Sequence, residues 1–290
     1  MDTKGNSFKK ILLIFQIAAI GLFLGRGWQH LFGDAPFRTF LWDEEIMSEF
    51  VNSWLSMSWE DYVRSPIVDD NIQNLIKGFG IFYLILAAIS LFIKKLPDWI
   101  ISLLWLGSIA LIGLALLYMK NAFFSVGQFF EYSLQFLTPV FLWLFFYQKI
   151  SKKRLLIFFK IAIALTFICH GLYAVGYYPR PVLFMQMTMR TFGFSEGLAA
   201  TFLEVAGYLD FIVAVLIFLP PKIAKYALAY CVFWGFLTTF ARIVGNFYPE
   251  FWADSLFKWT PEALYRFPHF LIPLAAIYLQ QHIFLGKELN

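Results

Sequence analysis

The residues best suited to chemistry are ionisable side chains that interrupt apolar runs in the second half of the chain. His170, Glu204, Arg242 and His269 lie in four different apolar segments, and Asp210 lies deeper in the same segment as Glu204. Ionisable side chains within a bilayer are costly, so they usually face the protein interior and mark a function. With a rise of about 1.5 Å per residue, the first four are placed in one layer of the membrane. Together they form a candidate site.

Five further polar residues share helix faces with these groups or with each other: Tyr173, Tyr177, Asn246, Arg26 and His30. The two tyrosines follow His170 by three and seven residues, and the asparagine follows Arg242 by four, spacings that place residues on one helix face. We expect the tyrosines to line a pocket. In the first half, Arg26 and His30 predict a similar polar layer with fewer members.

Three chemical interpretations of the cluster are open. In the first, Glu204 pairs with Arg242 and the network only holds helices together. In the second, His170 and Glu204 exchange protons with a quinone, while Arg242 and His269 orient it, and the deeper Asp210, a further catalytic candidate, is either protonated or paired.

In the third interpretation, His170, His269 and Glu204 hold a metal ion, but no local ligand spacing such as His-x-x-x-His supports it. We therefore expect no metal and take a quinone as the candidate cofactor.

The composition places these residues in a membrane protein. Of the 290 residues, 60% are hydrophobic and 14% are charged, against about 45–50% and about 25% in soluble domains. A soluble enzyme and a disordered regulator are excluded. Both cysteines, Cys169 and Cys231, lie in apolar runs, which excludes a disulfide scaffold.

Eight segments approach the roughly 20 apolar residues that a membrane-spanning helix needs. They are 9–32, 73–93, 98–119, 130–148, 154–177, 197–219, 223–245 and 263–284. We therefore predict an all-α polytopic membrane protein with about eight transmembrane helices.

The distribution of charge predicts the orientation. Thirteen of the 23 basic residues, but only three of the 19 acidic ones, lie at the termini and the even-numbered hairpins. Short cytoplasmic loops are enriched in Lys and Arg, so we expect a cytoplasmic membrane protein with both termini in the cytoplasm. Because the bases adjoin the lipid headgroups, the expected contacts include membrane lipids and exclude nucleic acid.

The two halves of the chain resemble each other. Corresponding features are Gly27 with Gly171, Gly80 with Gly207, and Gln135–Pro139 with His269–Pro273. We predict two parallel four-helix repeats, 1–150 and 151–290.

The segment 33–72 is acidic and predicts an extracytoplasmic helical cap, with one short amphipathic helix at 43–55 and another beginning after Ser58. Such a cap covers helix ends, gates the site or binds a partner.

Three short sequences carry a family resemblance: Phe167–Leu172, Gly193–Ser195 and Glu204–Asp210. With them, the second half resembles the DoxX/DoxD-like four-helix membrane proteins over about residues 154–285, and the first half does so more faintly. The resemblance implies a bacterial cytoplasmic membrane protein, in a family with members linked to quinone-dependent sulfur oxidation. The doubled unit and the acidic cap depart from that family.

The sequence thus favours a quinone-linked or accessory subunit of a membrane complex, with a lipophilic ligand in the outer leaflet of the second repeat. One alternative is a transporter or lipid-binding protein that uses a cleft between the repeats and Asp210 as coupling site. Another is a purely structural subunit. The expected partners are other membrane subunits or an extracytoplasmic protein bound to the cap.

Overall fold

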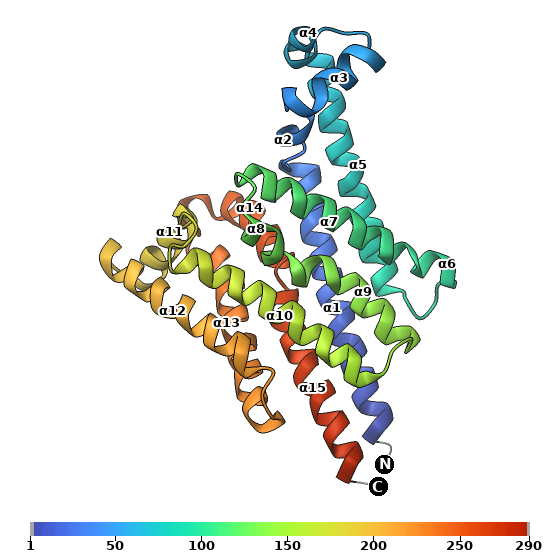
Figure 1. Ribbon diagram of the computed structural model, residues 1–290, viewed down its shortest axis with the longest axis vertical. Helices are drawn as coiled ribbons and strands as arrows, with labels where there is room; N and C mark the ends of the chain where they lie inside the picture. Colours follow the sequence, from blue (N-terminus) through green and yellow to red (C-terminus); the bar gives the residue numbers. More distant parts are fainter. Residues whose placement is uncertain (1–2, 289–290) are drawn as a thin grey trace.

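The chain folds into helices throughout (Figure 1). A computed structural model describes the backbone of residues 3–288 and the side chains of residues 8–284. The long helices are α1 (Thr3–Phe32), α5 (Pro66–Leu91), α7 (Leu103–Asn121), α9 (Ser133–Tyr147), α10 (Lys152–Ala174), α12 (Glu196–Leu216), α13 (Pro221–Val244) and α15 (Pro268–Glu288). The short helices are α2 (Arg38–Leu41), α3 (Glu44–Trp54), α4 (Trp59–Arg64), α6 (Asp98–Ile101), α8 (Val126–Glu131), α11 (Val182–Phe192), η1 (Pro249–Phe251) and α14 (Trp252–Leu264).

Seven helical segments among the described residues are long and apolar enough to cross a bilayer. They correspond to the first seven predicted segments, so the all-α polytopic membrane fold is confirmed. The eighth predicted segment corresponds to α15, a helix of 21 residues whose last side chains lie outside the described part. The start of α1 and the end of α15 lie at the same end of the molecule (Figure 1).

Local signals account for the boundaries that differ from the predicted ones. The second long helix begins at Pro66 because the hydroxyl of Ser65 accepts a hydrogen bond from the amide of Val68 and proline fits the first helical position. The fourth predicted segment divides at Tyr132 into α8 and α9. The eighth begins at Pro268, after the separate helix α14.

Corresponding helices make corresponding contacts in the two halves. In the first half, α1 packs on α5 and α9, and α7 packs on α9. In the second half, α10 packs on α12 and α15, and α13 packs on α15. Between the halves, α1 packs on α15 while α10 packs on α9, and α9 contacts α15.

Two glycine crossings have the same geometry in the two halves. A Cβ on Gly27 would lie 3.1 Å from the carbonyl oxygen of Gly80, and one on Gly80 would lie 3.1 Å from that of Gly27. For Gly171 and Gly207 both distances are 2.9 Å. The paired glycines therefore let the first two long helices of each half approach closely.

The cap, residues 33–72, comprises α2, α3, α4 and the start of α5, and it lies beyond the end of the bundle (Figure 1). Its small core contains Met47, Val51 and Tyr62. Asp43 caps α3 and forms an ion pair with Lys120 at the end of α7, and Ser58 caps α4. The two short helices predicted from the sequence are confirmed.

Candidate functional site

A cavity of about 250 Å³ lies among α10, α11, α12 and α13 in the second half. In Figure 1, α12 and α13 diverge from the hairpin that joins them, and α11 lies near their open ends. The polar residues that line the cavity are His170, Thr188, Thr191, Asp210, Trp234, Thr238 and Arg242. Three predicted site residues, His170, Asp210 and Arg242, are thus brought to one cavity.

The rim of the cavity is apolar and open to the outside of the protein. Phe192, Leu237 and Val244 line the cavity and are also exposed. All three belong to the part of the bundle formed by α11 and the membrane-spanning helix α13. Bilayer lipid would therefore cover this rim, and a lipophilic molecule could pass through it without crossing water.

Four buried polar atoms of the cavity lining have no hydrogen-bond partner among the described residues. They are Thr191 Oγ1, Asp210 Oδ1, Trp234 Nε1 and Arg242 Nε, although the Trp234 indole and the Tyr230 hydroxyl lie close enough to Asp210 to interact with its carboxyl group. A buried polar group without a partner costs about 1–3 kcal/mol, so such groups are rare unless something else satisfies them. Their convergence on one cavity points to a ligand with polar atoms.

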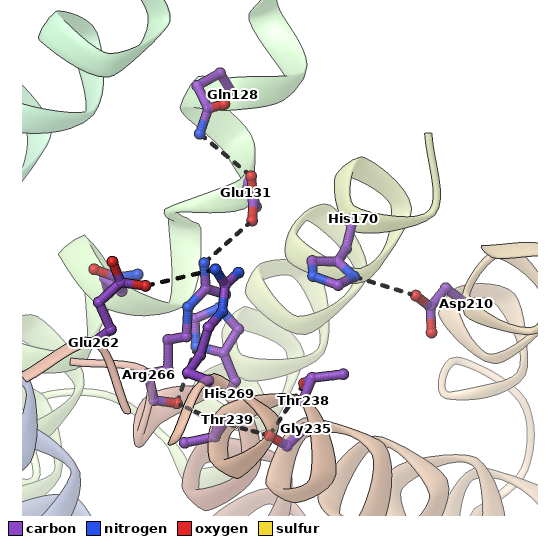
Figure 2. A network of polar contacts seen from close by, with 12 residues as sticks. Gln128, Glu131, His170, Asp210, Gly235, Thr238, Thr239, Glu262, Arg266 and His269 are labelled. Carbon is purple, nitrogen blue, oxygen red and sulfur yellow. Dashed lines mark hydrogen bonds and ion pairs between the residues drawn. The ribbon is translucent and has the colours of Figure 1, made fainter. Parts of the chain in front are cut away.

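His170 and Asp210 are two titratable side chains that lie next to each other in the cavity (Figure 2). The Nδ1 atom of His170 lies 3.8 Å from Oδ2 of Asp210, an ion-pair distance longer than a direct hydrogen bond. The carboxylate is almost completely buried, with a side-chain exposure of 1%. An imidazole and a carboxyl group side by side can each take up or release a proton, so the pair is suited to proton exchange with a ligand.

A smaller cavity of about 10 Å³ adjoins the first and is lined by His170, Asp210, Trp234 and His269, among others. The ring of His269 donates from Nδ1 to the carbonyl oxygen of Arg266 at 3.1 Å, because a carbonyl can only accept. Its Nε2 atom is then an acceptor, and it has no partner in the described part of the chain. The space suffices for about one water-sized group. The unpartnered polar atoms among its lining residues are Trp234 Nε1, Asp210 Oδ1 and His269 Nε2.

Two ion pairs lie behind the cavity, and the one between Arg266 and Glu131 connects the two halves (Figure 2). Arg242 Nη1 lies 3.5 Å from Glu262 Oε2, and Arg266 Nη2 lies 3.9 Å from Glu131 Oε1. Gln128 donates to the second oxygen of Glu131 at 3.3 Å. Arg242 therefore has a carboxylate partner, but that partner belongs to α14.

The structure does not bring Glu204 to the site. Its side chain is exposed on the outer face of α12, and Arg242 pairs with Glu262 instead. Six residues turn a helix by about 240°, so Glu204 and Asp210 cannot share a face. Two expectations for Glu204 are therefore corrected: it does not lie where it could exchange protons at this cavity, and it does not pair with Arg242.

The remaining predicted residues of the second half lie around the cavity and do not line it. Tyr173 is buried in a small apolar cluster with Phe184 and Met187 of α11. Tyr177 is 72% exposed and cannot line a pocket wall. Asn246 is buried and donates to the carbonyl oxygen of Arg242 at 2.9 Å, so it supports the end of α13.

Arg26 and His30 lie in the first half, away from this cavity. Arg26 is fully buried, its Nε donates to Gln135 at 3.2 Å, and its guanidinium lies 3.9 Å from the ring centroid of Tyr265. His30 packs edge-on against Tyr83, with ring centroids 5.1 Å apart. The contacts of Arg26 join α1 to α9 and to Tyr265, the residue after α14, and so lie between the halves, where the sequence allowed a cleft. The contact of His30 joins α1 to α5 within the first half.

Trp234 and Thr191 are site residues that the sequence analysis missed. Trp234, Thr238 and Arg242 follow each other at four-residue intervals on α13, which places them on one face. That spacing, anchored on Arg242, is the signal that could have found Trp234. No comparable signal connects Thr191 to the other helices.

Within residues 8–284, no three His, Cys, Asp or Glu side chains are grouped so that they could hold a metal ion. The arrangement suits hydrogen bonding and proton exchange with an organic ligand. Comparison of the chain with protein-family models, with curated proteins and with solved structures finds no match.

Proposed function

We propose that this protein binds a lipophilic molecule with a polar head group, which reaches the cavity among α10 to α13 from the bilayer. The supporting observation is the combination of four unpartnered buried polar atoms with an apolar rim. An amphipathic ligand satisfies both features at once. Its head group would hydrogen-bond to Asp210 and Trp234, and its chain would leave along Leu237 and Val244 into lipid.

An isoprenoid quinone is the ligand we propose within this class, in keeping with the DoxX-like resemblance. A quinone carbonyl would accept from Trp234 Nε1 or Arg242 Nε, and a quinol hydroxyl would donate to Asp210 Oδ1. His170 would take up the proton that a quinol releases, with Asp210 stabilising the imidazolium. Oxidation of a quinol releases two protons and two electrons. Asp210, which accepts the hydrogen bond of the quinol hydroxyl, would take up the second proton, and the two electrons must pass to a redox partner protein, so the role we propose is that of a quinone-linked subunit.

The proposal also covers the location of the protein and its orientation in the membrane. We propose a bacterial cytoplasmic membrane, cytoplasmic termini and a cap on the outer side, on the basis of the charge distribution. The matching helix contacts and glycine crossings support a duplicated four-helix unit. A transporter in which Asp210 is the coupling site stays as the alternative, with the same cavity in place of a cleft between the halves.

The test is to identify the molecule that is bound to the protein. Full-length protein is extracted with its native lipid in polymer-bounded nanodiscs, and the organic extract is analysed by mass spectrometry. We expect one quinone to be enriched over its share of the surrounding membrane, and the enrichment to be reduced in Asp210→Asn and Trp234→Phe. Tyr83→Phe is the matched control, because Tyr83 follows Gly80 as Asp210 follows Gly207, by three residues.

Other outcomes have definite meanings. Enrichment of a diacyl lipid that depends on Asp210 and Trp234 would retain the cavity and replace the quinone. An extract with the composition of the bulk membrane, unchanged in the variants, would overturn ligand binding. Uptake of a solute into vesicles that is lost in Asp210→Asn would favour the transporter.

A further inference from the structure

Helix α3 of the cap has an apolar face that the protein covers only in part. Met47 and Val51 on this face are buried in the cap core. Ile46, Phe50 and Trp54, spaced by four residues, are exposed, and Trp54 is 79% exposed. At 100° per residue these three span about 80° of the helix beside the buried pair. Nothing else in the described chain covers this stripe.

The stripe is held in a fixed position. Asp43 accepts a hydrogen bond from the amide of Ile46 at 3.2 Å and forms an ion pair with Lys120. Arg38 binds Asp69 at 2.7 Å, which fixes the cap to the start of α5. The rings of Phe50 and Trp54 stack on each other, with centroids 6.4 Å apart. A partner would therefore find this surface already ordered, which lowers the entropic cost of binding.

The surroundings of the stripe are strongly acidic. Residues 33–72 contain nine acidic and two basic residues. Asp34, Asp43, Glu60 and Asp69 are paired within the protein. Glu45 and Glu49 are exposed on α3, on the side of the stripe away from the buried residues. A partner that covers the stripe would thus meet carboxylates along one edge.

We propose that α3 is a docking surface for a basic amphipathic helix of another protein. Apolar side chains of that helix would cover Ile46, Phe50 and Trp54, and its Lys or Arg side chains would pair with Glu45 and Glu49. A second cap would bring like charges together, and an anionic membrane surface would be repelled. The cap also lies beyond the hydrocarbon core of the bilayer, because the 26 residues of α5 span about 39 Å, more than the core thickness of about 30 Å.

The test uses the full-length protein in phosphatidylcholine nanodiscs and a dye-labelled peptide of 18 residues in which leucine and lysine form an amphipathic helix. We expect binding in excess of that to empty nanodiscs. It should weaken about tenfold or more in Phe50→Ser/Trp54→Ser, about tenfold in Glu45→Lys/Glu49→Lys, and on raising the salt to about 0.5 M. Ile67→Ser is the control, because Ile67 is 72% exposed in the cap but lies outside the stripe.

Photo-crosslinking in cells extends the test to the natural partner. A photoreactive residue at position 53, beside the stripe, should crosslink to a peptide rich in Lys or Arg, and the Glu45→Lys/Glu49→Lys change should remove that product. Equal binding of a leucine–glutamate peptide, or crosslinks only to lipid or to another copy of this chain, would overturn the proposal. None of these results depends on the cavity, so the docking surface can fail while ligand binding holds.

Discussion

Asp210→Asn should weaken ligand binding without destabilising the fold. The carboxyl group is buried, His170 lies within ion-pair distance, and Trp234 and Tyr230 lie beside it, while Oδ1 makes no hydrogen bond of normal geometry to a described residue. Asparagine keeps the shape and one acceptor oxygen but removes the negative charge. The variant therefore isolates the contribution of charge to binding.

The magnitude follows from the difference between two kinds of hydrogen bond. A bond to a charged group contributes about 1.5–3 kcal/mol and a neutral one about 0.5–1.5 kcal/mol. The difference, about 1–1.5 kcal/mol, corresponds to a Kd about five- to tenfold higher. Asp210→Leu removes the acceptor as well and should raise Kd about ten- to a hundredfold. Both variants also remove the cost of burying the Asp210 carboxyl group, so the thermal stability of the free protein should not fall in either of them.

The assay is a titration of the nanodisc-embedded protein with a short-chain quinone, followed by quenching of tryptophan fluorescence. Trp234→Phe identifies the part of the signal that comes from the cavity, and Tyr83→Phe should bind as the unmodified protein does. A Kd for Asp210→Asn equal to that of the unmodified protein would refute the hydrogen bond we assign to Oδ1. A lower melting temperature in that variant would refute the assignment of this carboxylate to binding and favour a structural role.

Three further changes test separate features. Ala206→Phe should fill the cavity and abolish quinone binding without lowering the melting temperature. In the control Val205→Phe, which changes the exposed face of α12, the protein should bind quinone normally. Titration and thermal melting measure the two properties. Gly171→Ala should lower the free energy of unfolding by about 1–3 kcal/mol, because the new Cβ would lie 2.9 Å from the Gly207 carbonyl oxygen. Gly113→Ala is the control and should leave the free energy of unfolding unchanged, because no atom lies within 4 Å of the new Cβ. The hydrogen bond with Lys120 lowers the pKa of Asp43 below its usual 3.8. The contact therefore stabilises the folded cap above about pH 3.8, and this stabilisation is lost as the pH falls through the lowered pKa. Hydrogen exchange in α3 should increase over that acidic range, and Asp43→Asn should remove the change.

Much of the site could be predicted because a charged residue in an apolar run carries a strong signal. Asp210, His170 and Arg242 were identified from their cost within the bilayer, and all three line the cavity. Glu204 gave the same signal by type, but the rotation along α12 carries it to the exposed face. Weighing helical rotation together with residue type would have separated Glu204 from Asp210.

Other features could not be predicted, for physical reasons. Trp234 is one of 60 aromatic residues, since the chain has 36 Phe, 14 Tyr and 10 Trp, so its type alone carries little information. The ion pair between Arg266 and Glu131 joins residues 135 positions apart, and no local spacing indicates such a contact. The depth of the cavity depends on how far α12 and α13 diverge, which is set by packing on α10 and α15.

A difference between the two halves accounts for the space beside Asp210. At the position that corresponds to Asp210, three residues after the crossing glycine, the first half has Tyr83, whose buried ring packs against His30 and Phe23. The large ring fills space that the smaller aspartate leaves open between α12 and α13. If one unit was duplicated, the first half has become the scaffold that bears the cap, and the second has kept room for a ligand. Exchange of residues at these matched positions, Tyr83→Asp and Asp210→Tyr, should accordingly leave no cavity in the second half and place an unpaired carboxylate in a packed first half.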